Sequence, residues 1–263
     1  MMTPDSIRID SIRPDWPAPD NVAAAITLRS GGCSHAPFDQ SNLALHVQDN
    51  PQHVQANRDS LTQSLKLPAQ PLWLEQYHST ELVYAPQFSS SQTAPRADGS
   101  YSDQPGTVCA ILTADCLPVL LCDRAGTQVA AAHAGWRGLC AGILRKMVAT
   151  FTSPADQLIA YLGPAIGPQQ FEVGAEVLQA FLDNGQDSHH RAAIAAAFSR
   201  RAAIRQQEKY LADLCALARA ELAACGLTAV YGGEYCSYTD SERFYSYRRE
   251  AQTGRNASLI WLR

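Results

Sequence analysis

Charge of either sign is scarce in this sequence. Only 17% of its residues are charged, and 21 Lys and Arg stand against 25 Asp and Glu, for a formal net charge of −4. A balance so close to neutral offers no basic surface for nucleic acid or for an acidic membrane, so we expect neither as a partner. No exposed apolar stripe is evident in the sequence, and we expect no obligate protein partner.

Long hydrophobic runs are also missing. No apolar segment approaches the roughly 20 residues that a membrane helix needs. The first residues, MMTPDSIRID, lack the basic patch and apolar stretch of a secretory signal. We therefore expect a cytoplasmic protein.

Internal repeats, charge blocks and long linkers are absent as well. A length of 263 residues is at the upper end of what one hydrophobic core supports, so we predict a single domain over residues 1–263. The hydrophobic content of 46% is that of an ordinary globular protein. The one low-complexity stretch, QFSSSQTAPRADGS at residues 87–100, predicts a surface loop.

The eight cysteines need not form disulfides. A chain of this length without an export signal does not depend on such cross-links for stability. Several cysteines lie within apolar runs, such as Cys109 in VCAIL and Cys122 in VLLCD, where a free thiol behaves as a small hydrophobic group. We expect all eight to be reduced.

Short apolar runs bounded by turn residues are mixed with amphipathic segments along the chain. The runs predict strands over residues 22–28, 71–76, 80–85, 107–112, 118–123, 127–133, 157–164, 229–233 and 257–262. The amphipathic segments predict helices over residues 51–65, 139–151, 174–185 and 208–226. Because strands and helices do not alternate strictly, we predict an α+β fold with a mixed β-sheet flanked by helices.

Cys116 lies in ILTADCLPVL, at the break between two predicted buried strands. A thiol in such a turn is held in place by its neighbours and can face a cleft. A buried structural cysteine is the alternative, since free cysteines are commonly buried.

His133 ends a predicted buried strand in AAAHAGWRG, and a helix follows it. Sites in proteins with open α/β sheets gather at the carboxyl ends of strands. Gly135 and Gly138 allow a tight turn, the helix start offers unpaired N–H groups for an anion, and Arg137 adds a positive charge. The segment is not a Walker loop, because it lacks the GKS or GKT ending.

His78, in LEQYHSTEL, joins two predicted short strands and supplies a second imidazole. With Cys116 and His133 it completes the donor set of open zinc sites, in which water is the fourth ligand. The three residues are too far apart in sequence for a zinc finger, so we predict a catalytic zinc centre rather than a structural one.

Several longer motifs resemble those of the bacterial laccase-domain family, whose members are variously named polyphenol oxidases and purine nucleoside phosphorylases. The motifs are RSGGCSHAPFDQSNLALHVQDNPQHVQANR, LEQYHST, ADGSYS, LTADCLPVLL, AAHAGWRGLCAGIL, YLGPAIGPQQFEVGAEV, FYSYRRE and TGRNASLIWL. The resemblance implies a single α+β domain and a zinc ion held by the histidine of Q-x-H, the cysteine of TADC and the histidine of HAGWRG. These residues are His78, Cys116 and His133. It further implies phosphorolysis of adenosine, inosine and 5′-methylthioadenosine, and hydrolytic deamination of adenosine.

The histidine count argues against multicopper chemistry. A multicopper oxidase needs roughly ten histidines, many of them in His-x-His pairs, because copper favours imidazole. This chain has seven histidines and no His-x-His, and we place His189 and His190 in a polar loop. Copper could still occupy the zinc site adventitiously, because copper binds such ligands more tightly than zinc.

A phosphorylase also needs groups that hold its substrates, which here would be a purine nucleoside and phosphate. Our candidate cations are Arg58, in the 51–65 helix, and Arg248 in FYSYRRE, with surface or ion-paired roles as the alternative. Asn42 could hydrogen-bond the substrate or stabilise a turn. Asp115 could orient a ligand histidine or act as a catalytic base, and Gln76 is a weaker candidate of the same kind.

Two other functions use the same residues. In the first, Cys116 is a nucleophile and His133 its base, as in thiol amidohydrolases, and the protein edits peptidoglycan precursors, a role also linked to the family. In the second, the chain is a structural or partner-binding zinc protein without catalytic activity. Metal content discriminates the first alternative from a zinc enzyme, and nucleoside turnover discriminates the second.

Overall fold

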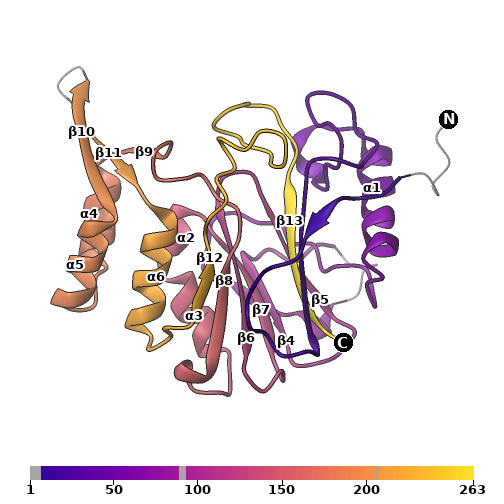
Figure 1. The fold of residues 1–263 in the computed structure, drawn as a ribbon, viewed down its shortest axis with the longest axis horizontal. Helices are drawn as coiled ribbons and strands as arrows, with labels where there is room; N and C mark the ends of the chain where they lie inside the picture. Colours follow the sequence, from indigo (N-terminus) through magenta and orange to yellow (C-terminus); the bar gives the residue numbers. More distant parts are fainter. Residues whose placement is uncertain (1–6, 89–92, 205–206) are drawn as a thin grey trace.

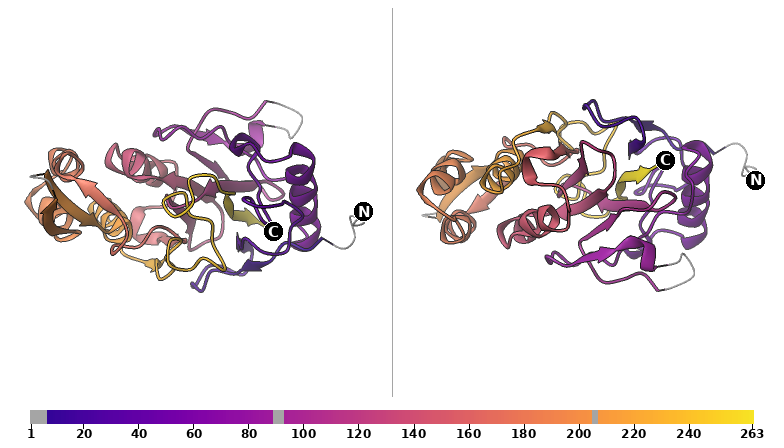
Figure 2. Two further views of the ribbon diagram at one scale, coloured as in Figure 1. Left: turned by 90° about the horizontal axis from the view of Figure 1, so that it is seen from above. Right: turned by 90° about the horizontal axis from the view of Figure 1, so that it is seen from below.

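Two β-sheets packed face to face, with helices on both outer faces, make up the body of the protein (Figures 1 and 2). The computed structural model describes residues 7–88, 93–204 and 207–263. Within these residues no helix is long and apolar enough to cross a membrane. The predicted α+β fold with a mixed sheet is confirmed.

The larger sheet has six strands in the order β12-β8-β6-β7-β4-β3. Its strands are β3 (Leu82–Tyr84), β4 (Gly99–Ser102), β6 (Leu117–Asp123), β7 (Val129–Ala134), β8 (Leu158–Leu162) and β12 (Val230–Gly232). The pairs β12–β8 and β3–β4 are parallel and the others antiparallel, so the sheet is mixed.

The smaller sheet has four strands in the order β1-β2-β13-β5, all antiparallel. They are β1 (Ser11–Ile12), β2 (Val22–Thr27), β5 (Val108–Thr113) and β13 (Asn256–Leu262). β13 therefore brings the end of the chain beside β5, the strand that leads into the turn with Cys116.

Continuous apolar runs in the central strands follow from burial on both faces. In β6, Leu117, Val119 and Leu121 point toward a core shared with helices α2, α3 and α6, whereas Leu120 and Cys122 point toward the smaller sheet. The outer face of the smaller sheet packs against Leu61 of α1 (Pro51–Ser64). The layers thus run helices, sheet, sheet, helix, as Figure 1 shows from left to right.

The remaining helices lie on the side of the larger sheet away from α1 (Figure 1). They are α2 (Trp136–Cys140), α3 (Ile143–Ala149), α4 (Ala175–Asp183), α5 (Ser188–Ala196) and α6 (Leu214–Ala224). Elsewhere in the described residues, short 3-10 helices are η2 (Leu45–Val47), η3 (Ala85–Gln87) and η4 (Ala155–Gln157). Helices α4 and α5, together with a small antiparallel sheet, form the end of the molecule opposite α1 (Figure 1).

The predicted helix over residues 208–226 is wrong in its first third. Residues Gln207–Ala212 form β11, which pairs with β10 (Phe198–Ile204) and β9 (Glu172–Gly174) in a three-stranded sheet. The helix begins only after Asp213, whose side chain accepts a hydrogen bond from the N–H of Ala216 as an N-cap. The apolar spacing typical of a helix continues through β11, and only the N-cap residue Asp213 marks the boundary between strand and helix.

Three other predicted elements differ from the structure. The helix over 139–151 is divided into α2 and α3 at Gly142, which has a φ of +93°. The predicted strand over 71–76 makes only isolated bridges, at Leu72 and Glu75. The predicted loop over 87–100 contains the start of β4, and its residues 89–92 lie outside the described part of the chain.

His189 and His190 do not lie in a polar loop. Both are in α5, where the ring of His190 is buried and its Nε2 lies 3.3 Å from the Glu221 carboxylate of α6. All eight cysteines are free thiols, as predicted.

Candidate metal centre

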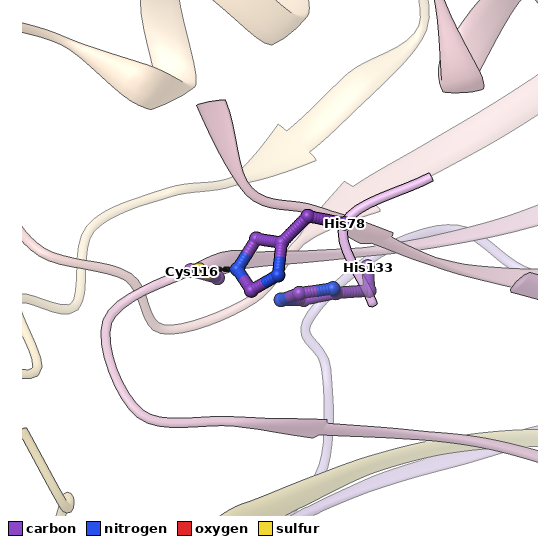
Figure 3. A group of neighbouring side chains, drawn as sticks. All are labelled: His78, Cys116 and His133. Carbon is purple, nitrogen blue, oxygen red and sulfur yellow. Dashed lines mark hydrogen bonds between the residues drawn. The ribbon is translucent and has the colours of Figure 1, made fainter. Parts of the chain in front are cut away.

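The three predicted ligands, far apart in sequence, meet at the ends of the central strands β6 and β7 of the larger sheet. His133 lies in β7, Cys116 in the turn between β5 and β6, and His78 in the loop before β3. All their metal-ligating atoms lie within 4.8 Å of one another. Cys116 Sγ is 3.7 Å from His78 Nε2, and the two imidazole rings are 4.8 Å apart at 68° (Figure 3). Two imidazoles and a thiol thus point into one small volume.

Gly135 makes room for this convergence. A Cβ atom built on Gly135 would lie 3.0 Å from Cys116 Sγ and 3.0 Å from His78 Cδ2. The φ of Gly135 is −58°, a value that other residues adopt easily, so the glycine is needed for space rather than for a tight turn. The predicted reason for a glycine here was backbone freedom, and the structure shows close packing instead.

The Asp98 carboxylate holds both histidines in place through hydrogen bonds. Its fully buried carboxylate accepts hydrogen bonds from the N–H groups of Tyr77, His78 and Ser79, at 3.2, 3.0 and 2.6 Å. It also accepts one from His133 Nδ1 at 2.8 Å. The three amide bonds hold the loop in place although His78 has a φ of +65°, which non-glycine residues seldom adopt.

Hydrogen bonds and neighbouring charges shift the pKa values of Asp98, Cys116 and His133. Burial alone would raise the pKa of Asp98, but the hydrogen bonds from His133 and Ser79 outweigh it and hold the pKa well below its usual range. Burial likewise opposes ionisation of Cys116, but His133 and His78 lower the pKa of the thiol to about 6. Against burial, the Cys116 thiolate and Asp98 raise the pKa of His133 to about 9. At neutral pH the metal-free residues form a thiolate–imidazolium pair.

This donor set fits a divalent metal ion. A metal-ligating histidine commonly gives its second ring nitrogen to a carboxylate, and the Asp98 bond to Nδ1 leaves Nε2 of His133 for a metal. Two imidazoles and a thiolate are one of the sets that hold catalytic zinc with an open fourth position. Sequence reasoning missed Asp98, although it lies in ADGSYS, one of the motifs that carried the resemblance.

A pocket of about 390 Å³ opens above the three ligands. Its volume is within the range typical of small-molecule sites. Four polar residues that sequence reasoning had not selected line it, namely His46, Thr113, Tyr247 and Arg255. The Arg255 guanidinium is anchored by the carbonyl oxygens of Thr253 and Gly254, both at 2.9 Å.

The pairing of β13 with β5 is the signal that places Arg255 near the metal ligands. This residue directly precedes β13, in which Asn256 pairs with Thr113 shortly before Cys116. A cation at the start of the last strand therefore lines the same pocket as the metal ligands. Burial lowers the pKa of Arg255, whereas Cys116 and Asp115 oppose that shift, so negative charge is close to the guanidinium.

Asn42 and Gln76 use their amides within the protein. Asn42 is buried, and its Oδ1 accepts hydrogen bonds from the N–H groups of Ala44 and Arg255, both at 3.0 Å. Gln76 lines the pocket, but its amide bonds the backbone N–H and carbonyl of Leu112, at 2.8 and 2.9 Å. Both residues hold backbone that forms the pocket wall, and contact with a substrate stays a prediction.

Asp115 and Arg248 lie beside the pocket rather than in its lining. Asp115 accepts hydrogen bonds from Ser237 Oγ at 2.7 Å and from the Arg248 N–H at 2.6 Å. The carboxylate that orients His133 is Asp98 instead. The Arg248 guanidinium packs over Phe171. A role of Asp115 as a base, and of Arg248 in binding, stays a prediction.

The other predicted cations also lie outside the pocket lining. Arg58 donates from Nε to the carbonyl oxygen of Leu43 at 2.9 Å and packs over Trp73, and burial lowers its pKa to about 10. It is nevertheless close enough to His46, which lines the pocket, to act with burial and Arg255 in lowering the pKa of that histidine. Arg137 is exposed and packs over Trp136, so it does not contribute to the pocket.

Fold and site together define an α+β protein with a candidate metal centre of two imidazoles and one thiol in a small-molecule pocket. Residues 23–263 match the family model described as multi-copper polyphenol oxidoreductase laccase. The chain belongs to this family, and the resemblance seen in its motifs is confirmed.

Several relatives named as purine nucleoside phosphorylases align along nearly the full length. Purine nucleoside phosphorylase YfiH of Escherichia coli K12 is 50% identical over 251 residues, covering 95% of this chain and 98% of the relative. The purine nucleoside phosphorylase of Haemophilus influenzae is 42% identical, covering 96% and 99%.

The fold is also that of solved relatives. A crystal structure of a Neisseria meningitidis protein superimposes with a TM-score of 0.87 at 46% identity, covering 96% of this chain and 98% of that one. YlmD from Geobacillus stearothermophilus gives a TM-score of 0.85 at 28% identity, covering 96% of both chains.

Proposed function

We propose that this protein is a metal-dependent purine nucleoside phosphorylase. The observation that carries the proposal is the convergence of His78, Cys116 and His133 within 4.8 Å in a pocket that also contains Arg255. The names of relatives up to 50% identical over nearly the whole chain support the same activity.

Zinc is the metal that we assign to the centre. The set of two imidazoles and one thiolate suits zinc, and zinc held there supplies a Lewis acid that strengthens an oxygen nucleophile at neutral pH. Copper binds such ligands more tightly and is an adventitious occupant in this proposal. The family description mentions several copper ions, but the described residues contain only one group suited to a metal by the closeness of its donor atoms.

In phosphorolysis a phosphate oxygen bonds to the ribose carbon that carries the base, and the bond from that carbon to the base nitrogen breaks. The electron pair of this bond leaves with the base, which then takes up a proton. The chain must therefore hold a phosphate anion next to the ribose. Arg255 is suited to do this, because a guanidinium binds two phosphate oxygens at once and its Nη1 is already anchored by two backbone carbonyls.

The nucleoside base needs a different surface. Tyr247 lines the pocket with 57% of its surface exposed, and an exposed aromatic ring can stack on a purine. His46 lines the same wall, and burial together with Arg255 and Arg58 lowers its pKa, so it is a neutral hydrogen-bonding group at pH 7. Adenosine, inosine and 5′-methylthioadenosine are the proposed substrates, with hydrolytic deamination of adenosine as a side activity.

Elemental analysis of protein purified without added metal, together with an adenosine assay with and without phosphate, tests this function. We expect at least one zinc ion per chain, and adenine with ribose 1-phosphate only when phosphate is present. Inosine formed without phosphate would report deamination. Cys116→Ala and His133→Ala should each abolish zinc binding at this centre and turnover, while circular dichroism stays unchanged. Phosphorolysis by a metal-free variant would overturn the mechanism.

A second candidate is a thiol amidohydrolase acting on peptidoglycan precursors. The thiolate–imidazolium pair favours it, because a lowered pKa of Cys116 and an adjacent histidine are what a cysteine nucleophile requires. The two functions differ in metal dependence. A chelator that removes the ion should abolish nucleoside phosphorolysis, whereas a cysteine nucleophile would become free to react. Full amidase activity after chelation would establish this candidate.

We place the protein in the cytoplasm, where purine nucleosides and phosphate are available, and assign it no macromolecular partner. A structural zinc protein would keep the metal but turn over none of the nucleosides named above.

A further inference from the structure

A second cavity, of about 690 Å³, lies between α1 and the loop that contains residues 32–35. None of its lining residues belongs to the pocket of the metal centre. Cys33, His35 and His53 all line it, so a thiol and two imidazoles share this space. They are the same three side-chain types that form the metal centre.

The histidine pairs of the two cavities have similar geometry. The rings of His35 and His53 are 5.0 Å apart in an edge-on arrangement at 88°, compared with 4.8 Å and 68° for His78 and His133. Cys33 Sγ lies 3.6 Å from the carbonyl oxygen of His53, to which it donates a weak hydrogen bond. The thiol is thus next to the helix residue that carries one of the two rings.

Hydrogen bonds hold the backbone of the Cys33 loop in place. The N–H of Cys33 donates to Asn57 Oδ1 at 2.9 Å. The next residue, Ser34, is buried and donates from its hydroxyl to Asp49 at 2.7 Å and from its N–H to the carbonyl oxygen of Gln40 at 2.8 Å. Because these bonds use backbone groups and Ser34, they leave the side chains of Cys33 and His35 available.

The charge around the cavity suits a cation. The lining contains no Lys or Arg among the described residues, whereas Asp59 is part of it. The Asp49 carboxylate, which accepts a hydrogen bond from the Ser34 hydroxyl at 2.7 Å, adds negative charge beside the Cys33 loop. An anion would find no Lys or Arg to pair with in this lining.

We propose that Cys33, His35 and His53 bind a second, thiophilic transition-metal ion, separate from the catalytic centre. Imidazole and thiolate together select zinc or copper over magnesium and calcium. On binding, the thiol proton goes to solvent and Sγ leaves the carbonyl oxygen of His53. The site closes on the ion by side-chain rotation, since only the catalytic group already holds its donor atoms within 4.8 Å among the described residues. This proposal does not depend on nucleoside phosphorolysis.

Cobalt(II) titration of the full chain, after a chelator has removed its metal, tests the site by absorbance, because cobalt bound to a cysteine thiolate gives a charge-transfer band. We expect two equivalents to produce the band in the wild-type protein and one equivalent in Cys116→Ala, where the catalytic thiolate is absent. Cys33→Ser should also bind one equivalent and keep full phosphorolysis. The double variant should show no band, and zinc should displace cobalt from both sites.

His53→Gln distinguishes a built site from cobalt bound by a single thiol. It should remove the second equivalent as Cys33→Ser does, because one thiol and one imidazole do not hold the ion. Cys225→Ser, at a half-exposed thiol outside both cavities, is the matched control and should retain two equivalents. Equal band intensity per chain in the wild-type protein and Cys33→Ser, with both folded by circular dichroism, would overturn the proposal.

Discussion

The Asp98 carboxylate accepts a hydrogen bond from His133 Nδ1 at 2.8 Å, and the same Oδ1 atom accepts the His78 N–H at 3.0 Å. A single buried acid therefore fixes the ring of one proposed ligand and the backbone of another. The main-chain N–H of His133 also donates to the Asp98 carbonyl at 2.7 Å. The geometry of the centre consequently depends on a residue that does not itself face the metal.

Asp98→Asn should weaken metal binding without unfolding the protein. The amide keeps one acceptor oxygen but removes the negative charge that holds the His133 ring. We expect metal affinity to fall by about 10-fold to 100-fold, the usual effect of changing a residue that orients a ligand. Competition with a chromogenic chelator measures it. Asp123→Asn is the matched control, since that buried carboxylate also accepts backbone N–H groups but lies away from the centre.

Gly135→Ala should disrupt the metal centre by steric crowding alone. The new methyl group would lie 3.0 Å from both Cys116 Sγ and His78 Cδ2, closer than nearly all packed Cβ contacts, so the two ligands must shift by a few tenths of an ångström. We expect loss of stoichiometric zinc and of turnover, with a melting temperature close to that of the wild type. Gly185→Ala is the control, because its methyl group meets chiefly the flexible side chain of Arg191. Stoichiometric zinc in Gly135→Ala would show that the centre tolerates this contact.

Two of the three metal ligands were predictable because each is marked locally, and His78 was selected only because it completes their donor set. Cys116 and His133 lie at ends of strong apolar runs, and buried strands of one sheet place such ends together. Asp98 was not predictable in the same way, since it follows a polar stretch that reads as a loop. Its role follows from the pairing of β4 with β7, a contact between strands that no local pattern specifies.

The substrate residues were harder to predict for a related reason. Asn42, Arg58 and Gln76 have side chains suited to binding, but the fold uses their polar atoms to hold backbone carbonyls and amides. Arg255 reaches the pocket because β13 lies between β2 and β5. Which arginine points inward is decided by sheet order, and sheet order depends on contacts between distant segments.

The strand β11 was mistaken for helix for a different reason. Residues 208–212 continue the apolar spacing of α6, and a short strand between two others carries too few residues to establish its own period. Tertiary pairing with β9 and β10 overrides the local helical preference there.

Arg255→Gln should weaken phosphate binding more than nucleoside binding. A lost hydrogen bond to a charged group costs about 1.5–3 kcal/mol, so we expect the KM for phosphate to rise by about 10-fold to 100-fold. The KM for adenosine should change much less. Arg137→Gln is the control, because Arg137 is exposed and packs over Trp136 outside the pocket. Equal increases in both KM values would mean that Arg255 holds the nucleoside instead.

Glu221→Gln should change how stability depends on pH. Glu221 is buried in α6, 3.3 Å from His190 Nε2 and 3.8 Å from Arg145, with Cys140 and Cys225 also close. Burial raises its pKa from 4.5 to about 6, and Arg145 offsets only part of the shift. The folded protein therefore keeps a proton that the unfolded chain loses, so Glu221 lowers stability as the pH rises from 4.5 to 6.

Replacing the Glu221 carboxylate with a neutral amide removes this loss of stability at higher pH. Above pH 6 the Glu221→Gln variant should therefore melt at a higher temperature than the wild type, and the difference should shrink to nothing below pH 4.5. Burial lowers the pKa of His190, which reduces stability toward acid in both proteins and so largely cancels from the comparison. Thermal unfolding across this pH range gives the measurement, with the exposed Glu242→Gln as control. A difference in melting temperature that stays constant with pH would mean that Glu221 is charged throughout, held by Arg145 and His190.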